Sequence, residues 1–536
     1  MRWWCGIIPI LIVILCCVSA RAETAAEGGG NPKIVIIEFH GMKAGILDET
    51  LDGLPHFREM VKGPGDTQSY VFLPRVLVTI PAASVPGISS MYTGLTPQRT
   101  GVVSTIWYDR TDYKVRTMIS YFQQRINNIL EKNGVNTLFD YIGMAGGHSL
   151  TSMLMVTKGA DWSIKSGAYF WGNASTLGLF EKGFWFPSSP YIDERAVRGF
   201  LDGHLFSYPK SLQGLLRYKN LVPDVMVIQL LGTDLDAHYP SAHLMERHAS
   251  MDEIQKVYTR QVLDPIMGEL VQGLKDAGCY DDVIFVFVSE HGFTKIETHV
   301  PDDTVDKSLS GYFRLPGIGT VNKEAEAVVM PGASTKEVYL KNRATDNWFD
   351  PPRLCHDVKP AVDLLLDNAD ITESMHTLIV RQYPGERNEG VIENDAWWVF
   401  DWHTYCRGAR DDQSFLQALL PLQALGERFE LGDYLIRSLR QQYTRPTTPD
   451  LKVINKKGYL FEKDHRKYGH HGSYYPSDCV VSFWVAGPGL ASVIPGRHVI
   501  EEYTSTMDLV PLVMGLLGLS QPEGLNGTDP LRNIRR

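Results

Sequence analysis

The chain has 536 residues, a formal net charge of −10 and an ordinary globular composition, with 44% hydrophobic and 21% charged residues. This length accommodates one large α/β domain with an insertion, or two domains. The acidic balance excludes a nucleic-acid scaffold, which needs a basic face, but it is compatible with a small anionic substrate held by metal ions.

Residues 1–22 have the pattern of a secretory signal peptide. Arg2 opens a short basic region, an apolar stretch covers 6–18, and Ala20, Arg21 and Ala22 form a small-x-small cleavage site. The pattern predicts a secreted or periplasmic protein, which contacts a membrane only if the signal stays uncleaved.

The cysteines beyond this signal are Cys279, Cys355, Cys406 and Cys479. An exported compartment permits disulfides, and four cysteines allow three pairings. The pair Cys355–Cys406 is favoured because both residues lie in the same expected insertion, although spacing alone leaves the pairing open.

Three apolar, β-branched runs predict strands that are buried on both faces, which is typical of a parallel sheet. They lie within 33–41, 222–234 and 283–292. Apolar residues at helical spacing predict helices over 137–141 and 251–277. Strands that alternate with helices in this way indicate an α/β core.

The segment 302–466 breaks this pattern and predicts an insertion or cap region. Strand-like runs cover 326–330 and 337–340, a Pro-rich turn at 350–352 precedes a helix, and a helical pattern covers 413–442. The core pattern returns with a strand at 480–487 and a helix at 507–518. We therefore divide the chain into the signal (1–22), a first core part (31–301), the insertion (302–466) and a second core part (467–536).

Each of the three predicted strands leads into residue types that ligate metals. His40 ends the first, Asp234 and His238 follow the second, and Glu290 and His291 end the third. Open parallel sheets bind ligands at the carboxyl ends of their strands. A lone His or Asp is more often structural, but this set of nitrogen and oxygen ligands suits zinc. Another histidine, His471, lies in a glycine-flanked turn.

Ser84 precedes a Pro-Gly turn and an expected helix. A helix amino terminus offers unpaired amides and a partial positive charge, which favour a phosphoryl oxygen nearby. Ser84 is therefore a candidate nucleophile that metal coordination would activate. The alternative is a serine that only caps the helix.

In this order, the motifs resemble the alkaline phosphatase superfamily, and most of all its nucleotide pyrophosphatase/phosphodiesterase branch. The matching segments are His40-Gly41, Ser84-Val85-Pro86-Gly87 with Thr93-Gly94-Leu95, Asp234 to His238, Glu290-His291-Gly292 and His471-Gly472. The resemblance implies a three-layer α/β sandwich with a mostly parallel central sheet. It also implies two divalent metal ions, with zinc expected. The first would be held by Asp234, His238 and His471, and the second by His40, Ser84, Glu290 and His291.

The chain departs from the family pattern at several positions. His40 and Glu290 stand where the family has Asp, so the second site loses one negative charge and favours zinc over magnesium. Glu38, on the same strand face as His40, is a further candidate ligand. Thr105 stands where the phosphodiesterases have an Asn that holds a phosphoryl oxygen. Ile88 replaces the arginine of the sulfatase motif, which excludes a formylglycine sulfatase.

The resemblance predicts an exported, metal-dependent hydrolase of small phosphorylated substrates. The first expectation is a phosphodiesterase or nucleotide pyrophosphatase that acts through a phospho-serine at Ser84. The alternatives are a phosphomonoesterase of the same superfamily, or a catalytically inactive relative that acts as a binding protein.

Overall fold

The computed structural model describes residues 32–118, 122–164, 189–202, 222–240, 250–316, 322–332, 334–382 and 397–535. The predicted signal peptide lies outside the described residues. In the described part of the chain, no helix combines the length and apolar character needed to cross a membrane.

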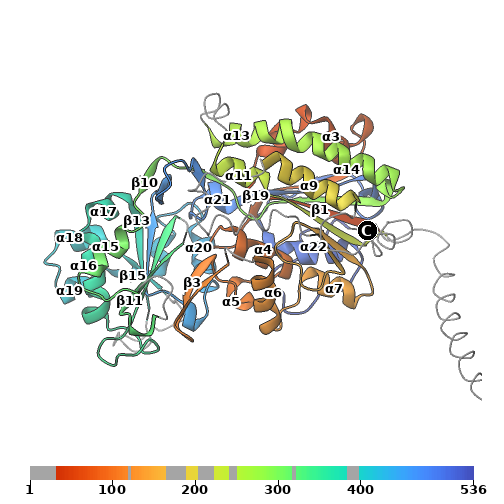
Figure 1. Cartoon of the computed structure of the whole chain (residues 1–536). Helices are drawn as coiled ribbons and strands as arrows, with labels where there is room; N and C mark the ends of the chain where they lie inside the picture. Colours follow the sequence, from red (N-terminus) through yellow and green to blue (C-terminus); the bar gives the residue numbers. More distant parts are fainter. Residues whose placement is uncertain are drawn as a thin grey trace, which may run out of the picture.

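A mixed sheet of nine strands forms the centre of the larger part of the molecule (Figure 1). The strand β1 (Lys33–Phe39) lies between β7 (Val225–Leu230) and β8 (Val283–Val288) and is parallel to both. On the far side of β7, the parallel order continues through β5 (Ser149–Ser152) and β6 (Trp162–Ile164). The three predicted apolar runs are thus neighbours in the middle of the sheet.

The other half of the sheet contains its antiparallel strand. β19 (Val480–Ala486) pairs antiparallel with β8 on one side and with β2 (Tyr70–Leu77) on the other. The short strands β20 (Arg497–Val499) and β21 (Thr504–Ser505) run parallel to β2. Strand 480–487, predicted from its apolar run, therefore lies next to the central strands.

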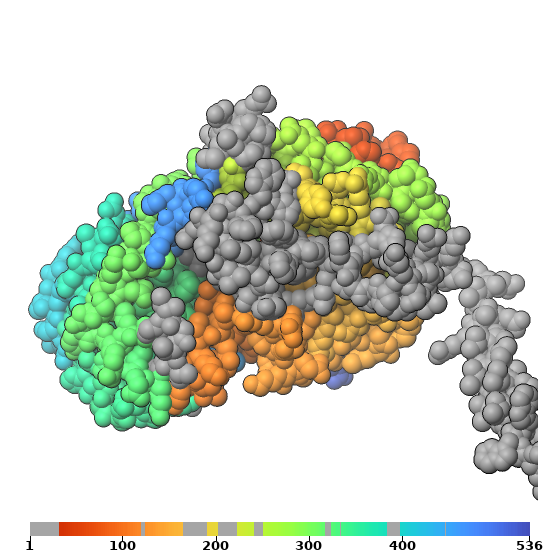
Figure 2. All heavy atoms as spheres, in the orientation of Figure 1, coloured from red at the N-terminus to blue at the C-terminus, as the bar shows by residue number. Residues whose placement is uncertain are grey.

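Helices cover both faces of this sheet. Alternate residues of β1 point into two separate cores, Ile34 and Ile36 into one and Val35 and Ile37 into the other. The first core is closed by α4 (Ser84–Thr93), α6 (Phe122–Lys132), α7 (Leu138–Met144) and α22 (Leu509–Leu516). The second is closed by α3 (Pro55–Lys62), α9 (Ser189–Asp202), α13 (Met251–Tyr258) and α14 (Asp264–Asp276). Figure 2 shows α9 (yellow), α13 and α14 (green) and α3 (red) together on one side of the molecule. The predicted three-layer α/β sandwich is confirmed.

The helix predicted over 251–277 is continuous but not uniform. Between α13 and α14, residues Thr259–Leu263 form a π-helical turn. Pro265 follows at the start of α14, and because proline has no amide proton it cannot complete the regular ladder of hydrogen bonds. The wider turn accommodates that loss.

A second sheet has six antiparallel strands in the order β11-β12-β16-β13-β14-β15, and α15 to α20 accompany it (Figure 1). Its strands are β11 (Ala327–Pro331), β12 (Thr335–Leu340), β13 (Met375–Arg381), β14 (Trp397–Phe400), β15 (Leu419–Pro421) and β16 (Leu451–Asn455). The helices are α15 (Thr304–Ser310), α16 (Lys359–Leu366), α17 (Ala369–Ser374), α18 (Trp402–Arg407), α19 (Asp412–Gln417) and α20 (Gly432–Arg440).

Two expectations for this region are wrong. The helical pattern over 413–442 is interrupted, because 419–421 form the edge strand β15 and pair with β14, and a 3₁₀ turn follows at Leu422–Leu425. Among the described residues the cysteines form no disulfide, so the favoured pairing of Cys355 with Cys406 is wrong as well. Cys406 lies exposed on α18, and Cys355 lies in a π-helical turn (Leu354–Val358) before α16.

Candidate metal centre

The carboxyl edge of the three central strands collects the predicted ligands. His40 follows β1, Glu290 and His291 follow β8, and α11 (Gly232–His238) follows β7. Asp234 and His238 are four residues apart on α11, so they lie on the same side of the helix. The Thr233 hydroxyl donates a hydrogen bond to the His40 carbonyl, which fixes α11 against the end of β1.

Gly41 makes this convergence possible. It has φ of +67°, and a Cβ built there would lie 3.0 Å from Asp234 Oδ1 and 3.1 Å from the His291 ring. Both the backbone conformation and the space therefore require glycine immediately after His40.

His471 reaches the same edge from a distant part of the sequence. The two-residue strand β18 (Gly469–His470) pairs antiparallel with β9 (Thr294–Lys295), which follows the Glu290–His291 turn. The Tyr468 amide donates to the His238 carbonyl at 2.9 Å. These backbone contacts place His471 among the side chains that the central strands supply.

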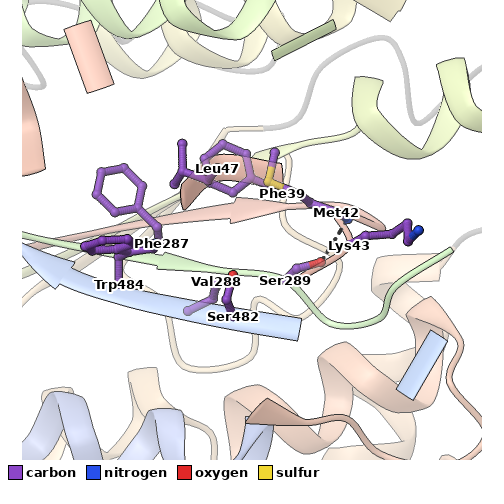
Figure 3. Close-up of a pocket in the computed structure, with 9 residues that line it drawn as sticks. All are labelled: Phe39, Met42, Lys43, Leu47, Phe287, Val288, Ser289, Ser482 and Trp484. Atoms are coloured by element: carbon purple, nitrogen blue, oxygen red, sulfur yellow. Dashed lines mark hydrogen bonds between the residues drawn. The ribbon is translucent and has the colours of Figure 1, made fainter. Parts of the chain in front are cut away.

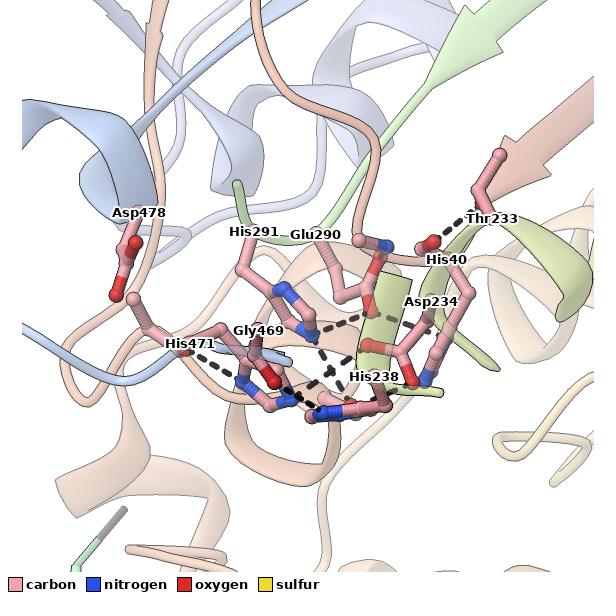
Figure 4. Close-up of polar contacts among 12 residues, drawn as sticks. His40, Thr233, Asp234, His238, Glu290, His291, Gly469, His471 and Asp478 are labelled. Carbon is pink, nitrogen blue, oxygen red and sulfur yellow. Dashed lines mark hydrogen bonds and ion pairs between the residues drawn. The ribbon is translucent and has the colours of Figure 1, made fainter. Parts of the chain in front are cut away.

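The ligand atoms lie close to one another (Figure 4). Glu290 Oε1 is 3.0 Å from both His40 Nδ1 and His291 Nε2. Asp234 Oδ2 is 3.5 Å from His238 Nε2, and Asp234 Oδ1 is 3.6 Å from His471 Nε2. Within the described residues, three overlapping groups have ligand atoms within 4.8 Å of one another: His40 with Glu290 and His291, Asp234 with His291 and His471, and His238 with His470 and His471.

The structure thus brings together six of the predicted metal ligands and adds one residue that the sequence did not single out. His470 lies beside His238 and His471. Its position in a double-histidine turn was visible in the sequence. The pairing of β18 with β9 brings this turn to the cluster, where His470 and His471 both lie close to His238.

Backbone carbonyls fix the tautomers of three of these histidines. The Nδ1 atoms of His238, His291 and His471 lie 2.8, 2.9 and 3.1 Å from the carbonyl oxygens of Gly469, Gly292 and Ala82. A carbonyl oxygen only accepts, so each Nδ1 must carry the proton and donate it. In the neutral ring this leaves the lone pair on Nε2, which is the arrangement that metal-binding histidines use.

Electrostatics also fit a bound cation. Asp234 Oδ1 and Glu290 Oε1 are buried and have no hydrogen-bond partner among the described residues. Burial opposes the ionisation of Glu290, but the charges of His291 and His40 hold its pKa well below the ordinary value. Burial lowers the pKa of His238 to about 4 and that of His471 well below its usual range. Ionised carboxylates and neutral imidazoles are the protonation states that ligate metals.

His40 and His291 differ from the other histidines in their protonation. Burial acts to lower both pKa values, but the carboxylate of Glu290 outweighs it and raises them above the usual range. Burial, followed by the charge of Glu290, raises the pKa of Glu38 to about 8. Without a cation, this side of the cluster therefore holds protons that a cation would have to displace.

Ser84 is the first residue of α4, and its Oγ lies 3.1 Å from His291 Nε2. The N-cap of the helix is Ala83, so Ser84 does not occupy the capping position, and its contact with His291 turns its hydroxyl toward the cluster. Gly87 permits the close approach, because a Cβ there would lie 3.2 Å from the Glu290 carbonyl oxygen. The amino terminus of α4 is thereby held directly against the candidate metal centre.

Thr105 is half-buried just before the strand β3 (Ile106–Asp109). Its carbonyl accepts a hydrogen bond from the Met118 amide at 2.9 Å. In the described ranges, no hydrogen bond joins its hydroxyl to the cluster. Its predicted role at a phosphoryl oxygen stays a prediction.

A separate small pocket lies beside the same strands (Figure 3). It is lined by Phe39, Met42, Lys43, Leu47, Phe287, Val288, Ser289, Ser482 and Trp484. None of the predicted ligands or Ser84 is among these residues, and most of the lining is apolar. The chemistry therefore points to the cluster in Figure 4 and not to this pocket.

Comparison with solved structures supports the fold. Mouse ectonucleotide pyrophosphatase/phosphodiesterase 5 aligns with a TM-score of 0.54 at 13% identity, covering 94% of this chain and 100% of that chain. An inactive variant of the mouse protein in complex with AMP has a TM-score of 0.53 at 14% identity, and the human protein 0.53 at 12%, with the same coverage. At these identities the likeness concerns the fold alone. No curated protein matches the sequence.

The family model for type I phosphodiesterase/nucleotide pyrophosphatase matches residues 34–473. This range contains all the predicted ligands, Ser84 and the whole second sheet. The resemblance to the nucleotide pyrophosphatase/phosphodiesterase branch is confirmed, and the chain belongs to the type I phosphodiesterase/nucleotide pyrophosphatase family of hydrolases.

Proposed function

We propose that this protein is an exported, metal-dependent hydrolase that cleaves phosphodiester or pyrophosphate bonds in small phosphorylated substrates. The observation that carries the proposal is the position of Ser84, whose Oγ lies at the amino terminus of α4 and 3.1 Å from His291 within the ligand cluster. A hydroxyl, a helix terminus and a group of metal ligands therefore meet at one place.

Two sets of side chains would hold two divalent cations, with zinc expected. Asp234, His238 and His471 form one set, and His40, Glu290 and His291 form the other, together with Ser84. Bound cations would lower the pKa of the Ser84 hydroxyl and offset negative charge on the phosphoryl group. The unpartnered oxygens of Asp234 and Glu290 support this assignment.

The chain's own residues would carry out a two-step displacement. Ser84 Oγ releases its proton to water and forms a bond to phosphorus while the bond to the leaving-group oxygen breaks, which gives a phospho-serine. The leaving-group oxygen takes up a proton from water. A water molecule then attacks the same phosphorus and releases Ser84 Oγ, which regains a proton. The first amides of α4 have no intrahelical partner and face the developing negative charge. Thr105 is proposed to donate to a phosphoryl oxygen.

A nucleotide is the first substrate class to test. The mouse relative of similar fold was solved in complex with AMP, which contains a phosphoryl group on a nucleoside. We therefore expect a substrate that releases a nucleoside monophosphate, either a dinucleotide or a nucleotide pyrophosphate.

The test is a paired measurement on one batch of purified protein. Turnover of bis-p-nitrophenyl phosphate and of p-nitrophenyl phosphate is compared, and bound zinc and magnesium are counted per chain. Two zinc equivalents with preferred diester turnover are expected. Preferred monoester turnover would overturn the diesterase assignment in favour of a phosphatase. No turnover of either ester, with metal in one site only, would favour an inactive binding protein.

A further inference from the structure

Glu38 is a buried carboxylate without a hydrogen-bond partner. It lies in β1, two residues before His40, and has no solvent exposure. Neither of its oxygens accepts a hydrogen bond from any described residue. An ionisable group in this state strongly disfavours folding unless a neighbouring charge compensates it, so its presence calls for a partner.

The environment of Glu38 is a polar layer directly beneath α4. Register pairs Glu38 with Gln229 on β7 and with Val288 on β8. Alternation along β1 places Glu38 on the same face as Ile34 and Ile36, which pack with Tyr92 of α4. The Gln229 Oε1 and the Tyr92 hydroxyl are also buried without a partner among the described residues. Polar atoms that lack partners thus continue from the ligand cluster into the sheet.

Glu38 contacts the ligand cluster at His40. Its Oε1 lies 3.7 Å from His40 Nδ1, and Glu290 Oε1 lies 3.0 Å from the same nitrogen. Gln229 Nε2 is a third neighbour of this nitrogen, at 3.2 Å. The Nδ1 atom of His40 therefore has two carboxylates as neighbours, and all three side chains are buried.

A charge count shows what this arrangement does for a cation. The group of His40, Glu290 and His291 contains one carboxylate, and imidazoles are neutral when they ligate. A divalent ion bound there by these side chains alone would leave one uncompensated positive charge in a buried site. While the Ser84 hydroxyl keeps its proton, Glu38, whose Oε1 lies 3.7 Å from His40 Nδ1, supplies the second negative charge that makes the site neutral.

We propose that Glu38 is a positioning residue of the second cation site, where it orients His40 and supplies the negative charge that completes the site for a divalent ion. The inference rests on the proposed function only in requiring that a cation binds, and it does not depend on which phosphate ester is cleaved. It predicts that Glu38 sets the affinity of one cation and not of the other.

The test counts metal in the full-length protein. Protein stripped with a chelator is dialysed against stepped concentrations of free zinc, and bound zinc per chain is determined by elemental analysis. Wild type is expected to bind two equivalents. The Glu38→Gln variant, which keeps the shape and removes the charge, is expected to bind the second equivalent about 10–100-fold more weakly and the first unchanged.

Thermal unfolding distinguishes this role from a purely structural one, because only a residue of the cation site should change the rise in Tm that zinc causes. Without metal, Glu38→Gln should unfold close to the temperature of wild type, because both side chains bury polar atoms that have no hydrogen-bond partner there. With zinc, its rise in Tm should be smaller than that of wild type. A variant that binds both equivalents like wild type and shows the same zinc-induced rise would overturn the inference.

Controls separate this result from a general loss of structure. Asp264→Asn removes another buried carboxylate, one that accepts from the His56 and Phe57 amides at 3.0 and 2.9 Å and lies outside the ligand groups, so its zinc binding should match wild type. If Glu38→Gln does not fold, Glu38→Met fills a similar volume without charge and gives the same readout. A further outcome is that wild type binds two zinc equivalents, with the second bound more weakly in Glu38→Gln, and yet cleaves neither ester. That result would overturn the proposed function and leave this inference intact. Failure of wild type to bind zinc would overturn both.

Discussion

Ser84 Oγ lies 3.1 Å from His291 Nε2, so the first residue of a helix and a residue beyond the end of a central strand meet at one point. The contact joins positions 207 residues apart in sequence. It places the hydroxyl where a nucleophile activated by a metal would have to lie.

The first prediction concerns this contact. Ser84→Ala should lower kcat by about three orders of magnitude or more, because it removes the attacking oxygen. Ser84→Thr keeps a hydroxyl and should retain part of the activity. Steady-state kinetics with a diester, alongside zinc content, provide the measurement. An Ala variant with wild-type turnover would exclude Ser84 as the nucleophile.

A second prediction concerns Gly41. Gly41→Ala should lower stability and also lower activity more than 10-fold, because the new methyl group meets Asp234 and His291. Gly65→Ala is the matched control, since Gly65 has nearly the same φ of +66° and nothing within 4 Å of an added Cβ. It should show only the conformational cost, about 1–2 kcal/mol by denaturant unfolding. Equal activity in the two variants would contradict the proposed crowding.

A third prediction concerns pH and the order in which metal is lost. The pKa values of His40 and His291 are raised by Glu290, so protons compete for these nitrogens at higher pH than usual. The pKa values of His238 and His471 are lowered by burial, to about 4 for His238, so these rings stay neutral in mild acid. As pH falls, affinity at the His40 site should therefore drop at a higher pH than affinity at the site of His238 and His471.

Zinc titrations at several pH values check this order. The Glu38→Gln variant weakens the His40 site and His238→Ala weakens the other, so the two variants identify which equivalent is lost. Loss of both equivalents at the same pH would contradict it. So would earlier loss of the equivalent that depends on His238.

A fourth prediction concerns a buried ion pair within the second sheet. Lys452 Nζ on β16 lies 3.1 Å from Glu337 Oε1 on β12 and donates to the Tyr474 hydroxyl at 2.9 Å. Both charged side chains are 1% exposed. Lys452→Met leaves the Glu337 carboxylate buried without its counter-ion and should destabilise the fold by about 3–5 kcal/mol.

The double variant Lys452→Met/Glu337→Leu removes both charges and should recover part of that loss. Urea unfolding of the wild type, the single variant and the double variant measures both effects. A single variant as stable as wild type would show that the pair contributes no net stability.

The central part of the fold could be predicted because its signal is local. The runs ending at Phe39, Leu230 and Val288 are apolar at most positions and buried along nearly their whole length, which is typical of strands covered on both faces. Their carboxyl ends meet in any parallel arrangement, so the proximity of His40, Asp234 and Glu290 followed from strand direction alone.

The remaining features depend on contacts that a single sequence does not display. His470 joins the cluster only through the pairing of Gly469–His470 with Thr294–Lys295. The edge strand Leu419–Pro421 has only three residues, too few to show as a strand in the sequence pattern, and it forms by pairing with the edge of β14. The prediction of a Cys355–Cys406 pairing depends on both cysteines lying in the same insertion. Membership of one segment does not determine the distance between two residues, and the two cysteines form no disulfide.

The short pairing of β18 with β9 has a further consequence for stability. Asp234 and His471, which are assigned to the same cation, stand on either side of the six-stranded sheet in sequence, and Asp234 Oδ1 lies 3.6 Å from His471 Nε2. An ion held jointly by residues on these two segments would act as a cross-link that closes a very long loop. Unfolding of the second sheet would then weaken binding of the ion. The free energy of unfolding of this sheet should therefore rise with the free concentration of the ion. Zinc would in that case stabilise the second sheet against unfolding, although the sheet contributes none of the predicted ligands.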